Sequence, residues 1–389
     1  HLLSRRQRQM CIRDSPICIG SGISRGINIY LNNVYIVADS VPALDIRSVD
    51  DVNIYLENNN FLKTQSSQKD VAALNMAPFS FPTINSQNNS GSLTVSSEQC
   101  PGIICTKRLT INGGSVTAYS TSGTGIENDS LTINGGSVTA SSADKTKKDI
   151  SSNQITINGG SVKASSVSGS PTNKGKEVYC CTIENPENAN VTIKPGTGSS
   201  EWNWKPVNHS SLDPDDTNLY VWLPKLESNS TNSYLIILDP KNGSESRTRN
   251  YSFDTVTNTF KAAQVVNDFR FKSPANLIYD GQPKKASLEF KFKPTHENDR
   301  TILLKYYEGK YENIKDNIDT IEPLQGAPVN AGTYTVKAEI GKSKSYFAHK
   351  GLVSPEWTFT IKKAPVAPGV DFNKTSISVS YTHLTLPTT

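Results

Sequence analysis

The chain has 389 residues, 35% of them hydrophobic, and a formal net charge of +4 at pH 7. The first 15 residues contribute +3 of this charge through four arginines and one aspartate, so the charge gives no reason to expect binding to nucleic acid. No apolar run approaches the roughly 20 residues of a membrane helix, and the length predicts two or three domains.

Both ends of the chain differ in composition from the segments beside them. Residues 1–15 and 380–389 resemble the translated adaptor or vector scars at the edges of metagenomic reading frames, and we set them aside in predicting the fold. Residues 365–379 are predicted to be a stiff linker followed by the start of a truncated element. We therefore expect that a signal peptide, if there was one, is missing from this sequence, and the mode of anchoring stays open.

A repeated decapeptide dominates the first half of the chain. The sequence LTINGGSVTA occurs at 109–118 and again at 131–140, and ITINGGSVKA follows at 155–164, so the starts are 22 and 24 residues apart. Self-similarity at this period, with residues alternating between apolar and polar on each side of Asn-Gly-Gly, predicts one β-strand unit stacked on itself. Weaker coils at 27–33 and 52–58, and a strand at 191–195, extend the predicted solenoid over 16–195, with a loop inserted near 68–90.

Stacking these copies in register assigns each repeated position to a side of the solenoid. The aliphatic positions point inward, and the threonines and asparagines form ladders outside, which we expect to be structural. The inward columns are Leu109, Leu131 and Ile155; Ile111, Ile133 and Ile157; and Val116, Val138 and Val162. Cys105 and Cys180 are expected to be small buried hydrophobes, with a disulfide such as Cys100–Cys105 as the alternative.

The pattern changes after the solenoid. Residues 196–265 contain aromatic segments with turn signals between them, which predict a small antiparallel β cap or connector. Residues 266–364 contain LIYDGQP at 277–283, VNAGTYTV at 329–336 and WTFTIKKA at 357–364. These motifs resemble the YDG/MBG-type Ig-like modules of bacterial surface proteins, a resemblance that implies an all-β stalk or spacer.

The INGGSV repeats are similar to coils of clostridial-type surface proteins described as carbohydrate-binding right-handed β-helices. In that group, calcium held by acidic outward positions assists sugar binding. The outward positions here are threonine and asparagine, so we predict no cofactor, with calcium the one that remains compatible. The predicted fold is thus all-β: a right-handed parallel β-helix, a small antiparallel cap and a C-terminal β-sandwich-like module.

Four aromatic residues, Trp202, Trp204, Tyr220 and Trp222, are the candidates for binding a ligand. Flat aromatic rings pair with the apolar faces of sugars, and Trp202 and Trp204 share one face of a strand. The alternative for these residues is the hydrophobic core of the cap. Asp213, Asp215 and Asp216 are weak candidates for metal binding, because a polar turn before the next strand is favoured.

No catalytic residue is predicted. A polysaccharide lyase would need acidic calcium ligands and a basic residue on neighbouring coils, and the repeats provide only Lys163, with Asp144 and Asp149 in the loop between copies. We therefore predict an extracellular bacterial surface protein that binds polysaccharide or host glycans without catalysis and whose oligomeric state is open. A β-helical lyase or hydrolase, or a purely structural rod, are the alternatives.

Overall fold

The structure, a computed structural model, describes residues 15–20, 26–47, 51–66, 68, 71–76, 81–87, 90–184, 189–195, 218–226, 233–291 and 300–365. The chain divides into two compact units. The first lies within residues 1–268, 290–301 and 340–350, and the second within 269–289, 302–339 and 351–389. Within the described residues nearly all of the regular secondary structure is β-strand. No helix in the part of the chain that the structure describes has the length and apolar character needed to cross a membrane.

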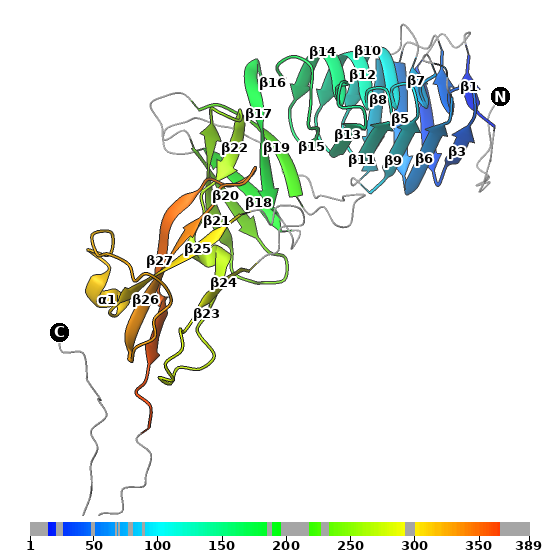
Figure 1. Cartoon of the computed structure of the whole chain (residues 1–389). Coiled ribbons are helices and arrows are strands. Elements are labelled where there is room, and N and C mark those ends of the chain that lie inside the picture. Colours follow the sequence, from blue (N-terminus) through cyan, green and yellow to red (C-terminus); the bar gives the residue numbers. More distant parts are fainter. Residues whose placement is uncertain are drawn as a thin grey trace, which may run out of the picture. The chain divides into compact units, whose positions relative to one another are not determined.

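The first unit begins with a parallel β-solenoid, as the repeats predict (Figure 1). Its strands stack coil on coil along three faces. The first face contains β1 (Ile17–Ile19), β4 (Leu44–Ile46), β7 (Leu74–Met76) and the first halves of β10 (Ile103–Ile111), β12 (Ile126–Ile133) and β14 (Ile150–Ile157). The second contains β2 (Ile27–Asn32), β5 (Asp51–Glu57), β8 (Phe81–Ser86) and the second halves of β10, β12 and β14. The third contains β3 (Tyr35–Ala38), β6 (Asn59–Thr64), β9 (Ser92–Ser97), β11 (Ser115–Ser120), β13 (Ser137–Ser142) and β15 (Ser161–Lys163).

The repeated decapeptides stand in the predicted register. Leu109 pairs with Leu131 and Leu131 with Ile155, and all three are buried. The corner after each asparagine has its second glycine at positive φ, as at Gly136 (φ 81°), where a side chain would be strained. A Cβ at Gly136 would lie 2.4 Å from the carbonyl oxygen of Gly114 in the preceding coil. The Asn-Gly-Gly corner is therefore required both by backbone conformation and by close stacking.

Two expectations about the solenoid are wrong. The segment near 68–90, predicted as an inserted loop, contains β7 and β8, which are in register with their neighbouring coils. β7 has only three residues and β8 contains Pro82, so the sequence pattern is weak, although the neighbouring coils supply the pairing. The strand at 191–195 is not a coil: β18 (Asn190–Pro195) pairs antiparallel with β20 (Ser233–Asp239). Alternation of apolar and polar residues is the same in both kinds of sheet.

An antiparallel sheet follows the last coil in the same unit. β16 (Thr172–Asn173) leads into β17 (Lys176–Glu184), which pairs antiparallel with β19 (Asn218–Pro224). β21 (Arg247–Asp254) and β22 (Thr259–Ala262) complete the sheet with β18 and β20, and the 3-10 turn η2 (Val266–Asp268) follows. One face of β17 and β19 packs on the solenoid core through Val178 and Trp222, while the other has its own core around Val221 and Phe260.

The second unit contains small sheets, as the all-β prediction requires. β23 (Phe269–Lys272) pairs with β24 (Ser287–Phe290), and β25 (Ile302–Glu308), β26 (Gly332–Ile340) and β27 (His349–Ile361) form a three-stranded sheet. A single turn of helix, α1 (Tyr311–Ile314), follows β25. Trp357 is buried and its ring packs against Phe269 and Phe271.

Candidate functional site

A cleft of about 720 Å³ lies in the first unit, where the last coil meets the antiparallel sheet. Its walls include Lys163 and Pro171 from the solenoid side, Tyr179 and Tyr220 from β17 and β19, and Asn258 from the turn before β22. The volume is in the range of sites that bind small molecules, about 300–1,000 Å³.

Strand geometry decides which residues of β19 face this cleft. β19 runs antiparallel to β17, with Tyr220 opposite Thr182 and Trp222 opposite Cys180. Because successive side chains of a strand point to opposite faces, Tyr220 and Trp222 share one face and Val221 lies on the other. The backbone N–H of Tyr220 donates to Ser161 Oγ at 2.9 Å, which fixes β19 against the last coil.

Trp222 is part of the hydrophobic core. Its side chain packs with the solenoid cluster, only 7% of the residue is exposed, and its indole Nε1–H donates to the carbonyl of Val162 at 3.0 Å. A buried indole normally needs such a partner for its N–H. Trp222 thus packs in the core of the solenoid, whereas the alternative drawn from the sequence was the core of the cap. Although Trp222 also borders the cleft, its burial argues against a role as a sugar-stacking ring.

Tyr220, by contrast, is half-buried in the cleft wall. The ammonium nitrogen of Lys163 lies 5.6 Å from the centre of its ring, within the range of a cation–π contact. Lys163 pairs with Thr139, and Thr139 pairs with Thr117, so the repeat replaces threonine by lysine in the coil that reaches the cleft. This substitution is a sequence signal that could have pointed to the cleft, although the sequence reasoning considered Lys163 only as a possible base of a lyase.

The opposite part of the cleft wall contains polar groups that the sequence alone did not single out. The hydroxyl of Tyr179 donates to Glu177 Oε2 at 2.7 Å, and this hydrogen bond lowers the pKa of Glu177. The Lys225 ammonium lies 5.7 Å from the Tyr179 ring centre. The pattern around residues 176–184 predicted only a strand, and nothing in it showed that Tyr179 would line a cleft.

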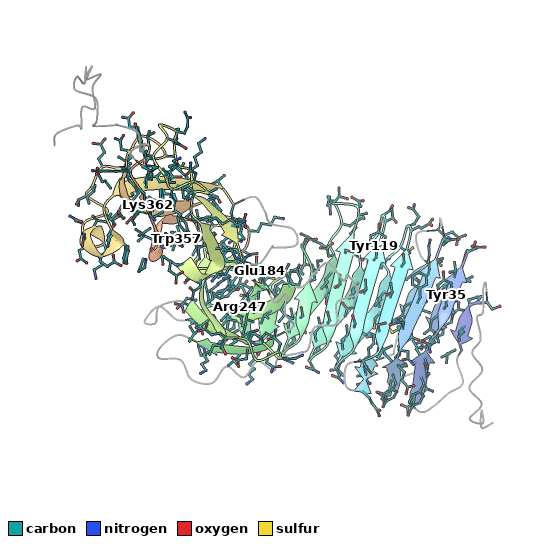
Figure 2. All side chains as sticks on the ribbon, turned by 90° about the horizontal axis from the view of Figure 1, so that it is seen from below. Tyr35, Tyr119, Glu184, Arg247, Trp357 and Lys362 are labelled. Atoms are coloured by element: carbon teal, nitrogen blue, oxygen red, sulfur yellow. The ribbon has the colours of Figure 1, made fainter. Side chains whose placement is uncertain are left out.

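Glu184 lies at the far end of β17 and also lines the cleft (Figure 2). Its carboxylate accepts a hydrogen bond from Tyr346 at 2.5 Å, and Arg249 contacts both Tyr346 and Asp268. Burial raises the pKa of Glu184, in the opposite direction to that of Glu177. Glu184 is therefore held in a buried polar network at one end of the cleft.

Several other residues named from the sequence have structural roles or lie elsewhere. Asp149 is buried, and its carboxylate accepts the backbone N–H groups of Ser142, Ser165 and Ser166. Cys105 is buried, and Cys180 packs against the solenoid core, where desolvation raises the pKa of its thiol to about 12. Trp202, Trp204, Asp213, Asp215 and Asp216 lie outside the described residues. Within the described ranges no group of three His, Cys, Asp or Glu side chains is placed to hold a metal ion.

Comparison with known proteins identifies a family. The family described as "Carbohydrate-binding domain-containing protein" matches residues 11–211, just over half of the chain. The matched segment contains the solenoid and the Lys163 and Tyr179 sides of the cleft. No curated protein and no solved structure matches the chain.

Proposed function

The chain belongs to this family of carbohydrate-binding domain-containing proteins, and on that premise we propose that it binds a glycan, without cleaving it, in the cleft beside Tyr220. We also place it, as part of the proposal, at the surface of a bacterium. The second unit, which resembles YDG/MBG-type modules, would then be the spacer that presents the first unit.

The observation that supports this site best is the pairing of Tyr220 with Lys163 inside a cleft of oligosaccharide size. An aromatic ring packs against the apolar face of a pyranose ring, while polar groups around it bond to the sugar hydroxyls. Lys163 supplies donors, and the Glu177 carboxylate supplies acceptors. The cleft therefore combines one stacking surface with the few convergent polar groups that glycan binding needs.

The positions of the carboxylates argue against glycoside hydrolysis. Among the described residues that line the cleft, the acidic ones are Glu177 and Glu184, which stand seven positions apart on one strand. At about 3.3 Å per residue they are separated by on the order of 20 Å. Paired catalytic carboxylates in glycosidases are at most about 9.5 Å apart. The opposed pKa shifts of the two glutamates thus do not make a catalytic pair.

The residues stacked on Lys163 in the preceding coils also argue against a lyase mechanism. Such a mechanism uses a basic residue beside acidic calcium ligands on adjacent coils. The residues stacked on Lys163 in the preceding coils are Thr139 and Thr117, which are uncharged. This arrangement supports binding without catalysis.

The test is a glycan array probed with the full chain, followed by titration of the bound glycan against wild type and Tyr220→Ala. We expect the dissociation constant to rise at least tenfold in Tyr220→Ala, about 1.4 kcal/mol. Tyr119→Ala is the matched control, because Tyr119 is an exposed tyrosine on the third solenoid face.

Three results would contradict the proposal. A silent array would favour the purely structural rod. An unchanged affinity of Tyr220→Ala for the glycan would show that the binding site is not beside Tyr220. Release of unsaturated sugars by the wild type, lost in Lys163→Ala, would establish the lyase instead.

A further inference from the structure

A second surface of the solenoid has the chemistry of a glycan-binding platform. It lies on the outward side of the second solenoid face, formed by β2, β5, β8 and the second halves of β10, β12 and β14, which we name the amide face. At its first coils, Tyr30 and Tyr55 stack with ring centres 4.9 Å apart and planes inclined by 14°. Tyr30 is 63% exposed, although an aromatic ring of this size is usually more covered.

A ladder of asparagines continues this tyrosine column along the solenoid. Tyr55 is in register with Asn85, and the amides then bond in series. Asn112 donates to Asn85 at 2.9 Å, Asn134 donates to Asn112 at 2.8 Å, and Asn158 donates to Asn134 at 2.8 Å. Asn112, Asn134 and Asn158 are exposed. One straight column thus has two stacked rings at its start and four linked amides after them.

The ladder leaves hydrogen-bonding capacity for a ligand. A primary amide has two N–H donors and an oxygen with two lone pairs. Asn112 and Asn134 each use one donor and one lone pair within the ladder. One donor and one acceptor therefore remain on each, repeated at about the 4.8 Å spacing of neighbouring strands. A polymer with regularly spaced hydroxyl groups is the ligand that such a repeat suits.

Charge narrows the class of ligand. Every described side chain in the tyrosine–amide column is uncharged. The column on one side of it is also uncharged and consists of Asn28, Asn53, Thr83, Thr110, Thr132 and Thr156. Glu57 lies in the adjacent column on the other side, where its carboxylate accepts a hydrogen bond from Asn32 at 3.0 Å. Arg108 stands in a more distant column, 5.4 Å from the Phe81 ring centre. The two uncharged columns have no cation for a phosphate or uronate, in contrast to the Lys163 side of the cleft.

We propose that the amide face binds an uncharged, extended polysaccharide that lies along the solenoid axis. A sugar ring stacks on the face of Tyr30 that Tyr55 does not cover, and hydroxyls of the following residues bond to the amide ladder. The choice of a glycan rests on the proposed function, and the surface is separate from the cleft beside Tyr220. The long ladder selects for chains of several residues over single sugars.

The third solenoid face offers a matched control. Tyr35 and Phe61 stack there with ring centres 5.0 Å apart, and Tyr35 is 48% exposed. Figure 2 labels Tyr35. Their column continues through Thr94, not through amides, and ends at Lys163. Removing this second stack deletes a similar pair of rings without touching the amide ladder.

The experiment measures the retardation of the full chain in native gels that contain a soluble uncharged polysaccharide, such as xyloglucan, mixed-linkage β-glucan or galactomannan. We expect Tyr30→Ser combined with Tyr55→Ser to weaken retention at least tenfold, and Tyr35→Ser combined with Phe61→Ser to leave it unchanged. Circular dichroism of each variant checks the fold. If the double variant does not fold, Tyr30→Ser alone serves, since this outermost ring is mostly exposed and its removal leaves the amide ladder in place.

The outcomes separate this inference from the proposed function. If retention of the wild type is lost in Tyr220→Ala but kept in the Tyr30 and Tyr55 variant, the cleft stands and the amide face is overturned. If the array shows binding to charged glycans and the gels show no binding to uncharged polymers, the proposal for the amide face is again refuted. If the Tyr30 variant changes only the molecular mass in solution, the surface binds a second copy of the chain, which also refutes the proposal.

Discussion

Replacing Trp222 by alanine tests whether this tryptophan belongs to the core or to the sugar site. The indole is 93% buried against the end of the solenoid, and its N–H bonds to the Val162 carbonyl. Truncation of a buried tryptophan costs about 3–5 kcal/mol, and the orphaned carbonyl adds to the loss. Tyr220→Ala, two residues away on the cleft wall, should cost only about 1 kcal/mol because its side chain is only partly buried.

Hydrogen exchange with mass spectrometry measures the loss of stability locally, at the end of the solenoid. A global unfolding midpoint is less suitable, because the chain has two units and the midpoint would average over both. Peptides covering β14 and β15 should exchange faster in Trp222→Ala by a factor of at least a hundred, which corresponds to about 2.7 kcal/mol. In Tyr220→Ala the same peptides should be close to wild type. Unchanged exchange in Trp222→Ala together with lost glycan binding would refute the core assignment and restore Trp222 as a stacking ring.

Two further predictions concern the corner of the repeat and the antiparallel sheet. Gly136→Ala should destabilise the solenoid by about 3–5 kcal/mol, because the new Cβ is placed on a left-handed backbone and collides with the preceding coil. Gly169→Ala is the control and should cost about 1–2 kcal/mol, because Gly169 also has a positive φ but has open space around it. Equal losses of exchange protection in the two variants would show that stacking does not constrain the corner. The hydrogen bond from Lys261 lowers the pKa of Asp254 to about 2, so the stability that this carboxylate contributes is present above pH 4 and is lost as the pH falls towards 2. The difference in exchange protection between wild type and Asp254→Asn, read in peptides covering β21 and β22, should therefore shrink over that range, and a constant difference would contradict the assignment.

The sequence predicted the solenoid well because three near-identical copies determine register directly. Once Leu109 is placed above Leu131, the inward aliphatics and the outward Thr and Asn ladders follow from strand alternation alone. The weak coils at 27–33 and 52–58 were also found, since Ile27 and Val52 pair as their pattern indicates.

The antiparallel part was less predictable for a physical reason. A strand such as β18 alternates in the same way whether its partner is the preceding coil or a strand about 40 residues later. The sequence named Tyr220 and Trp222 together as candidates, but it did not show that Trp222 would pack into the solenoid core while Tyr220 stays half-buried in the cleft wall. That distinction depends on where the Val162 carbonyl stands, which only the packed structure shows.

The most direct test of the account is the location of a bound oligosaccharide in a crystal of the full chain grown with the glycan that the array identifies. The account predicts a sugar ring in van der Waals contact with the Tyr220 ring, about 4 Å away, inside the cleft and beside Lys163. A glycan bound only to the second unit, or anywhere that leaves the cleft empty, would contradict it.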